Sequence, residues 1–245
     1  MEKSDWRVRF NAPAIVGKEM DYIADAVSQG RLSGDGKYTR LCHAWLEDTL
    51  GCNSALLTHS GTSALEMAAM LFDLGPGDEV IMPSFTFVST ANAFVSRGAT
   101  PVFVDISPDS LNIDVTQVAE AITDSTKAIV PVHYGGLPCD MKSLLQISKS
   151  ADLRIIEDAA HAMLSSLEGS YLGSIGDVGC ISFHETKNIV SGEGGALLIN
   201  DPGLAERAKV LWEKGTNRSA FNQGRVDKYT WIDIGSSFLP GELTA

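Results

Sequence analysis

The sequence predicts an α/β protein built on an open, mostly parallel sheet of seven strands with helices on both faces. Three observations indicate this fold class. The 245 residues are 44% hydrophobic and 20% charged, which is enough for one large core and excludes a disordered chain. Short β-branched runs alternate with amphipathic stretches along the chain, as they do in βαβ units. Several of these runs are almost continuously apolar, which is typical of parallel strands buried on both faces.

Seven short apolar runs are the expected strands. They lie at residues 55–58, 79–82, 101–105, 128–132, 154–157, 180–183 and 196–199. Between them, glycines at 75, 77 and 98 mark the ends of helices.

Four amphipathic stretches are the expected helices, and they fall within residues 20–27, 65–72, 115–122 and 204–212. Each carries apolar residues three and four positions apart, which is the spacing of one buried helix face. The first of these faces is expected to consist of Met20, Ile23, Ala24 and Val27.

The charge and the cysteines exclude several classes of protein. With 31 acidic against 19 basic side chains, the net charge of −12 predicts a surface that repels nucleic acid and anionic membranes. Residues 1–10 lack the apolar core of a signal peptide, and no apolar run approaches the roughly 18 residues that span a bilayer. The four cysteines are scattered without metal-binding spacing, so we expect reduced thiols, no metal site and a cytoplasmic protein.

The first strand is followed by a turn that suits a phosphate group. In an open parallel sheet, ligands bind beyond the carboxyl ends of the strands, so chemistry is expected in the residues after each strand. Gly61, Thr62 and Ser63 open a predicted helix, where free N–H groups, two hydroxyls and the positive end of the helix dipole favour an anion. The alternative is an ordinary N-cap without a ligand.

Two further strand ends carry an aromatic residue and an acid. Phe87 follows the second strand, where an aromatic ring can either stack on a flat heterocycle or pack in the core. Asp158 comes after the apolar residues of the fifth strand, and a carboxylate at that place needs a partner because an unpaired buried charge is costly. A pyridinium nitrogen would be such a partner; a helix N-cap or a structural ion pair are the alternatives.

Lys187 follows the sixth strand and precedes a glycine-rich loop at residues 191–195. A lysine held partly out of water there would have a lowered pKa and would favour Schiff-base chemistry, whereas a solvated loop lysine would not. A phosphate-binding turn, a stacking aromatic, an acid for a ring nitrogen and a reactive lysine are together the parts of a pyridoxal 5'-phosphate site.

The order of these parts resembles the DegT/DnrJ/StrS family of nucleotide-sugar aminotransferases, whose fold is that of fold-type I pyridoxal-phosphate enzymes. The resemblance runs from Phe10 to about Leu239. The matching segments are GDGKYTR (34–40), GTSALEMA (61–68), PGDEVIMPSFTFVSTANAF (76–94), FVDI (103–106), VPVHYGG (130–136), EDAAHA (157–162) and SFHETKN with GEGGALLIN (182–200).

The resemblance implies roles for four residues around the cofactor ring. Lys187 matches the catalytic lysine that binds the cofactor covalently, and Asp158 matches the acid that keeps the pyridine nitrogen protonated. Phe87 stands in the place of the aromatic that stacks on the ring. His161 stands where the family has His or Gln near the phenolic oxygen of the cofactor.

For the phosphate, the resemblance implies contacts from Thr62, Ser63 and Ser182. Many members add an asparagine from a second subunit, where this chain has Ser236, so a serine is expected to donate to the phosphate there. The implied assembly is a homodimer with shared active sites.

The resemblance also implies a reaction, in which an amino group passes from L-glutamate to a nucleotide-linked keto-deoxysugar. The segments FHETKN, EKGTNRS and YTWIDIGSS are most similar to those of members that convert dTDP-4-keto-6-deoxyglucose to dTDP-4-amino-4,6-dideoxygalactose. One alternative is a sugar dehydratase of the same fold, in which histidine replaces the lysine at position 187. The other is a regulatory protein that binds the cofactor without turnover.

Three regions are expected along the chain. Residues 1–30 form an N-terminal segment, and residues 31–238 form the large domain that binds the cofactor. Residues 239–245 would begin a small C-terminal domain that is truncated in this sequence.

Overall fold

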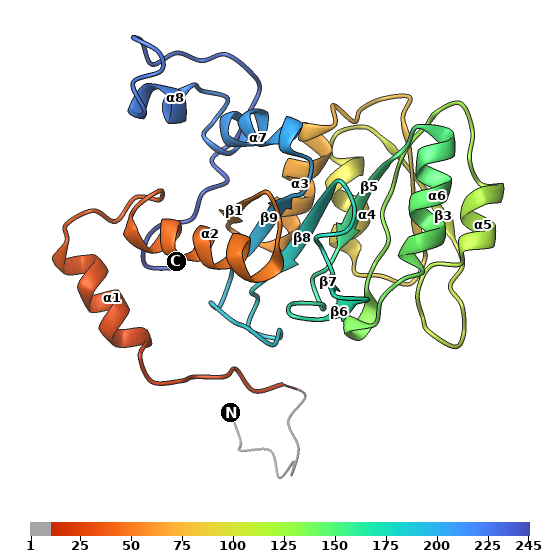
Figure 1. Ribbon diagram of the computed structural model, residues 1–245, viewed down its shortest axis with the longest axis horizontal. Coiled ribbons are helices and arrows are strands. Elements are labelled where there is room, and N and C mark those ends of the chain that lie inside the picture. The colour runs from red at the N-terminus through yellow and green to blue at the C-terminus, as the bar shows by residue number, and fades with distance from the viewer. Residues whose placement is uncertain (1–10) are drawn as a thin grey trace.

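The computed structural model describes residues 11–245; the first ten residues of the expected N-terminal segment lie outside the described residues. Seven strands form one sheet in the order β1-β9-β8-β5-β4-β2-β3, in which β9 is antiparallel to its neighbours and the others are parallel (Figure 1). The strands are β1 (Ser54–Thr58), β2 (Glu79–Pro83), β3 (Thr100–Val104), β4 (Thr126–Ile129), β5 (Arg154–Asp158), β8 (Val178–Ser182) and β9 (Gly195–Ile199). All seven predicted strands and the α/β fold class are therefore confirmed.

Helices cover both faces of this sheet. The helices are α1 (Glu19–Ser28), α2 (Lys37–Leu50), α3 (Gly61–Leu71), α4 (Val88–Val95), α5 (Val115–Glu120), α6 (Met141–Ala151), α7 (Ala205–Trp212) and α8 (Arg218–Asn222). Helices α3, α4 and α7 share one core with the sheet, while α2, α5 and α6 lie against the other face. A short hairpin of β6 (Ser166–Leu167) and β7 (Ser170–Tyr171) joins β5 to β8. Within residues 11–245, no helix is both long enough and apolar enough to span a bilayer.

The first predicted helix forms, but its predicted burial is wrong. In α1 the side chains of Met20 and Val27 are 72% and 54% exposed, and Ala26 is the buried residue of this helix. Figure 1 shows why: α1 lies outside the layers formed by the sheet and the other helices. The apolar spacing therefore predicted the helix correctly. Its apolar face, however, does not pack against the rest of the described chain.

Side chains of α2 and α7 protect the edge strand β1. The N–H groups of Ala55 and Leu57 donate to Glu47 Oε1 (3.0 Å) and His43 Nε2 (2.9 Å), which lie four residues apart on α2. The indole N–H of Trp212 donates to the carbonyl of Leu57 at 2.6 Å. Because unpaired strand edges recruit other strands, these contacts shield the outer side of β1.

The C-terminal residues are bound to the start of α2 through one carboxylate. Glu242 is buried, and its oxygens accept hydrogen bonds from the N–H groups of Gly36 (2.9 Å), Tyr38 (2.7 Å) and Thr39 (3.2 Å) and from the Thr39 hydroxyl. Burial acts to raise the pKa of this carboxyl, but these donors outweigh it and lower the pKa from 4.5. The carboxylate thus serves as a remote N-cap for α2. That residues 239–245 begin a further domain stays a prediction.

We expect Glu242→Gln to lower the free energy of unfolding by about 2 kcal/mol, because the amide replaces a charged acceptor by a donor facing N–H groups. Urea denaturation at pH 7 measures the effect, and Glu120→Gln, at the exposed end of α5, is the control. Since the pKa is lowered by folding, the stabilisation is present above about 4.5 and is lost as the pH falls below it. Equal stability of the variant and the wild type at pH 7 would contradict this role.

Candidate active site

The parallel strands β1, β5 and β8 end at the same edge of the sheet, at Thr58, Asp158 and Ser182. The residues that follow these ends, together with the start of α4 after β2, form the candidate site. Seven of the eight predicted residues belong to these segments: Thr62, Ser63, Phe87, Asp158, His161, Ser182 and Lys187.

The first turn of α3 lies next to Ser182 and is a candidate anion-binding surface. Ser60 caps the helix by accepting a hydrogen bond from the Ser63 N–H at 3.0 Å, and the two hydroxyl oxygens lie 3.1 Å apart. The Thr62 hydroxyl donates to Ser89 at 2.7 Å. A Cβ at Gly61 would lie 3.0 Å from the Ser182 Cβ, so glycine allows β8 to approach the helix start. Because an 11-residue helix starts here, its N–H groups and these hydroxyls suit a phosphate.

Asp158 is a buried carboxylate that accepts hydrogen bonds but forms no ion pair within the part of the chain that the structure describes. Its Oδ2 accepts from the Thr90 hydroxyl at 2.7 Å, and its Oδ1 accepts from the Ala160 N–H at 3.1 Å. The Thr86 hydroxyl lies 2.7 Å from that of Thr90 and completes a short chain of hydroxyls. No lysine, arginine or histidine within residues 11–245 forms an ion pair with this acid. The carboxylate is therefore suited to a positively charged nitrogen of a ligand.

Lys187 is half-buried in the loop between β8 and β9. Burial lowers the pKa of its amine, while the negative charge of Asp158 offsets part of this shift. A lowered pKa leaves more of the amine uncharged near neutral pH, and the uncharged amine is the form that attacks a carbonyl carbon.

The pKa of His161 is also shifted by burial and by the charges of Lys187 and Asp158. Burial lowers its pKa, the positive charge of Lys187 lowers it further, and Asp158 acts in the opposite direction. Its Nδ1 accepts a hydrogen bond from the Gly135 N–H at 3.3 Å, and the ring of Tyr134 lies edge-on to it with centroids 5.2 Å apart. A neutral ring that accepts at Nδ1 carries its proton on Nε2, which makes His161 a hydrogen-bond donor.

Phe87 is exposed at the start of α4, whereas Ser236 is held by backbone hydrogen bonds near the end of α7. Phe87 is the residue before α4 and its side chain is 71% exposed, so its ring is free to stack on a ligand and is not core packing. Ser236 is held at the end of α7, where its N–H donates to the Leu211 carbonyl (3.1 Å) and its carbonyl accepts from the Lys214 N–H (3.0 Å). No hydrogen bond among the described residues joins Ser236 to the other seven candidates.

Thr86, Thr90 and Gly135 are further candidate site residues, to which the sequence interpretation gave no role. The two threonines lie four residues apart, which was the available signal that both hydroxyls share one side of the chain entering α4. Gly135 lies in the matching segment 130–136, but the sequence did not reveal its contact with His161, because the two residues are 26 positions apart. Taken together, the start of α3, the buried carboxylate of Asp158 and the half-buried amine of Lys187 fit pyridoxal 5'-phosphate, which carries a phosphate, a basic ring nitrogen and an aldehyde.

The fold defines the class of protein. The chain superposes on an aminotransferase from Psychrobacter cryohalolentis with a TM-score of 0.89 and 30% identity, over 95% of this chain and 60% of that one. It also superposes on Spr1654 from Streptococcus pneumoniae in its PLP-form with a TM-score of 0.88 and 28% identity, over 98% and 64% of the two chains. The fold is that of the pyridoxal-phosphate-dependent aminotransferases.

Within that class, the chain belongs to the DegT/DnrJ/EryC1/StrS aminotransferase family, which matches residues 13–238. It is 38% identical to the spore coat polysaccharide biosynthesis protein SpsC of Bacillus subtilis, over 91% of this chain and 57% of SpsC. It is also 38% identical to the GDP-perosamine synthase of Caulobacter vibrioides, over 85% of this chain and 56% of that protein. The chain thus spans less than two thirds of the length of these relatives.

Proposed function

We propose that this chain carries the cofactor site of a pyridoxal-phosphate-dependent aminotransferase, which moves an amino group from L-glutamate to a nucleotide-linked keto-deoxysugar. The observation that carries the proposal is the buried Asp158, which forms no ion pair within residues 11–245 and whose charge acts on the half-buried amine of Lys187. Lysine at position 187 also argues against the dehydratase alternative, in which histidine would stand there.

Each residue of the site has a task in this function. The α3 start with Thr62 and Ser63, together with Ser182, binds the phosphate, and Phe87 covers one face of the ring. The Asp158 carboxylate, held by Thr90, stabilises a proton on the ring nitrogen.

When bound, pyridoxal phosphate would supply an electron sink that makes the α-carbon proton of an amino acid acidic. The Lys187 amine is the group placed to take that proton and to return it, as general base and then general acid. His161 donates a hydrogen bond from Nε2 toward the phenolic oxygen.

The finer proposal is that the acceptor is dTDP-4-keto-6-deoxyglucose and the product dTDP-4-amino-4,6-dideoxygalactose. It is supported by the segments 183–188, 213–219 and 229–237, and by relatives named for related sugars. One of these, from Saccharopolyspora spinosa, is named dTDP-4-dehydro-2,3,6-trideoxy-D-glucose 4-aminotransferase and is 36% identical over 97% of this chain and 63% of that protein.

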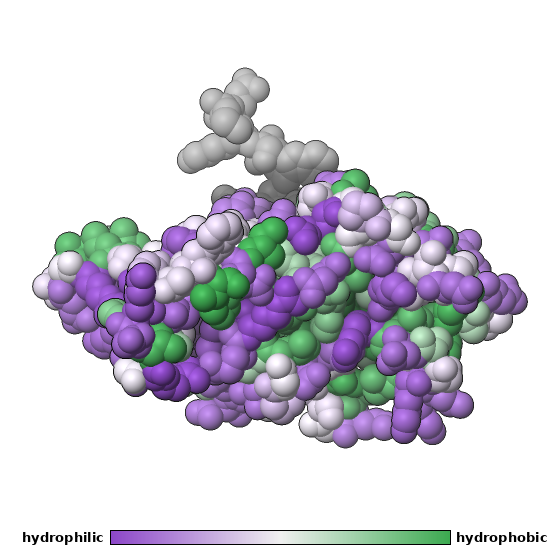
Figure 2. Space-filling model, turned by 90° about the horizontal axis from the view of Figure 1, so that it is seen from above, coloured by the Kyte–Doolittle hydropathy of each residue, from purple (hydrophilic) through white to green (hydrophobic). Residues whose placement is uncertain are grey.

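We further propose a cytoplasmic homodimer in which Ser236 contributes to the phosphate site of the partner subunit. The segment that precedes Ser236 exposes large apolar side chains, among them Trp231 (77%), Ile232 (58%) and Ile234 (48%). Figure 2 views the molecule from the side of α7 and α8 and shows separate apolar patches on a largely hydrophilic surface. Apolar patches of this kind are typical of protein contacts and support the dimer. The four free thiols support the cytoplasm, which is a reducing compartment.

The test is a half-reaction with L-glutamate, followed by the keto-sugar. We expect the absorption spectrum of the cofactor-loaded protein to change on adding glutamate and to return on adding dTDP-4-keto-6-deoxyglucose, as in ping-pong transamination. The product's stereochemistry then decides between galacto and gluco configuration. Cofactor binding without any glutamate-dependent change would support the regulatory alternative, and turnover with other keto-sugars only would overturn the finer proposal.

A further inference from the structure

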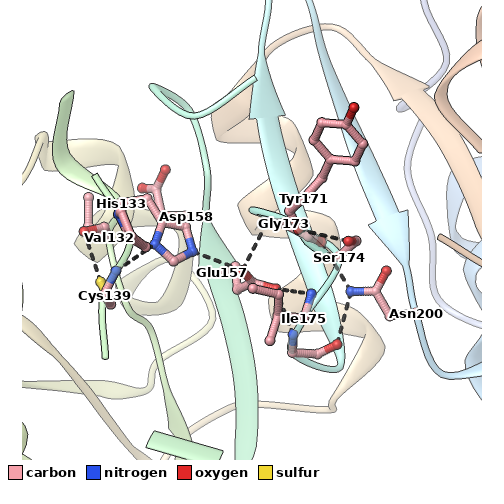
Figure 3. A network of polar contacts seen from close by, with 12 residues as sticks. Val132, His133, Cys139, Glu157, Asp158, Tyr171, Gly173, Ser174, Ile175 and Asn200 are labelled. Carbon is pink, nitrogen blue, oxygen red and sulfur yellow. Dashed lines mark hydrogen bonds and ion pairs between the residues drawn. The ribbon is translucent and has the colours of Figure 1, made fainter. Parts of the chain in front are cut away.

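A second buried carboxylate lies next to Asp158 on the same strand. Since side chains alternate along β5, Glu157 points to the opposite face of the sheet from Asp158. It is completely buried and accepts hydrogen bonds from the N–H groups of Gly173 (2.8 Å) and Ile175 (2.7 Å), which Figure 3 shows, and from that of Gly176 (2.6 Å). None of the ligand-binding roles proposed above involves Glu157.

The fourth contact of Glu157 is the ring of His133, which is also completely buried. The Nε2 atom of His133 lies 2.8 Å from Glu157 Oε2, and its Nδ1 accepts a hydrogen bond from the Cys139 N–H at 3.2 Å (Figure 3). Because Nδ1 accepts, the proton of the neutral ring is on Nε2, and the ring donates it to Glu157. Both nitrogens of His133 are therefore committed, and the ring has one orientation.

His133 begins the turn that reaches the candidate site. The backbone of His133 is tied to Asp158, whose carbonyl accepts the His133 N–H at 3.1 Å. The next residue, Tyr134, packs against the ring of His161, and Gly135 follows in the left-handed conformation with φ of +60°. The Gly135 N–H then donates to Nδ1 of His161. A continuous series of contacts thus leads from Glu157 to the ring of His161.

We propose that Glu157 and His133 are positioning residues for His161: they hold the turn so that the Gly135 N–H occupies Nδ1 and the proton of His161 stays on Nε2. This inference rests on the proposed function, in which Nε2 donates toward the phenolic oxygen of the cofactor. If the proton moved to Nδ1, the lone pair of Nε2 would face an oxygen acceptor instead. In this role Glu157 does not contact the ligand. It determines, through His133, which nitrogen of His161 carries the proton.

The test uses the full chain without cofactor and therefore does not depend on activity. At pH 8, nitrogen-15 NMR of the imidazole rings reports which nitrogen of His161 carries the proton, with the signals assigned by their loss in His161→Gln. In the wild type we expect the Nε2–H form alone. In His133→Leu, we expect the Nδ1–H form to appear and the Gly135 amide to exchange with solvent about fivefold faster, since a hydrogen bond of ordinary strength is lost.

Two further variants make the test specific. His133→Gln keeps an N–H donor for Glu157, so it should retain most of the Nε2–H form. Arg154→Gln removes an ion pair with Asp177 at the other end of β5 and should leave His161 unchanged. Glu157→Gln should behave as His133→Leu if it folds, because a side-chain NH2 then faces N–H donors; circular dichroism checks folding for every variant.

A folded His133→Leu variant with only the Nε2–H form and unchanged Gly135 exchange would overturn the proposal. The same shift in Arg154→Gln would do so as well, since it would show a general loss of packing. If the expected NMR changes occur in a protein that shows no glutamate half-reaction, the positioning contact stands and the proposed function fails.

Discussion

Lys187→Ala is expected to abolish turnover, with a loss of at least about 10³-fold in the glutamate half-reaction. The substitution removes both the amine that would bind the cofactor aldehyde and the group that would move the α-carbon proton. Some cofactor should still bind without a covalent bond, because the α3 start, Ser182 and Phe87 remain. Stopped-flow absorbance with L-glutamate measures the loss.

The matched control is Lys209→Ala on α7, where the amine pairs with Glu206 outside the site. Borohydride reduction in the presence of pyridoxal phosphate, followed by peptide mapping, should label Lys187 in the wild type and in the control. A label on Lys209 or Lys214, or full activity of Lys187→Ala, would contradict the assignment.

Asp158→Asn should lower turnover by about 10²-fold or more while nearly preserving shape. The asparagine removes the negative charge that would hold a proton on the ring nitrogen, and loss of one preorganised electrostatic group costs roughly this much. The protein should remain folded, since an amide can keep hydrogen bonds to Thr90 and Ala160. Turnover under saturating glutamate is the measurement.

A companion variant separates charge from orientation. Thr90→Val removes the hydroxyl that donates to Asp158 but leaves the charge, so its loss should be smaller, about tenfold. Thr90→Ser should restore most of the activity. Near-normal turnover in Asp158→Asn would mean that another group supports the ring nitrogen.

The sheet could be predicted from the sequence because its strands are short apolar runs whose pattern does not depend on distant residues. Helices α2, α4, α6 and α8 were not predicted. In α2, His43 and Glu47 accept hydrogen bonds from β1 and the buried Thr39 binds Glu242, so polar residues break the apolar stripe of this helix. Polar residues with structural tasks are the ones that a hydrophobic pattern cannot place.

For the site, the positions of the chain at strand ends were sufficient to gather seven candidates. The parallel order of β1, β5 and β8 brings their carboxyl ends to one edge, so residues 60–63, 158–161 and 182–187 meet there. Ser236 could not be placed in this way, because it follows no strand of the sheet and its proposed role depends on a second subunit. The roles of all eight candidates stay predictions, and the activity variants above test those of Lys187 and Asp158.

The shielded edge of β1 has a consequence for handling the protein in acid. Burial lowers the pKa of His43 to about 4, so at neutral pH its Nε2 is free to accept the Leu57 N–H. The folded protein therefore loses stability as the pH falls from about 6.5 toward 4. In this range His43 takes up a proton in the unfolded chain but not in the folded one. Once the ring is charged it can only donate, and the Leu57 amide is released to solvent. An acidified preparation would then expose one N–H group of the β1 edge, and unpaired strand edges are templates for fibrillar aggregation.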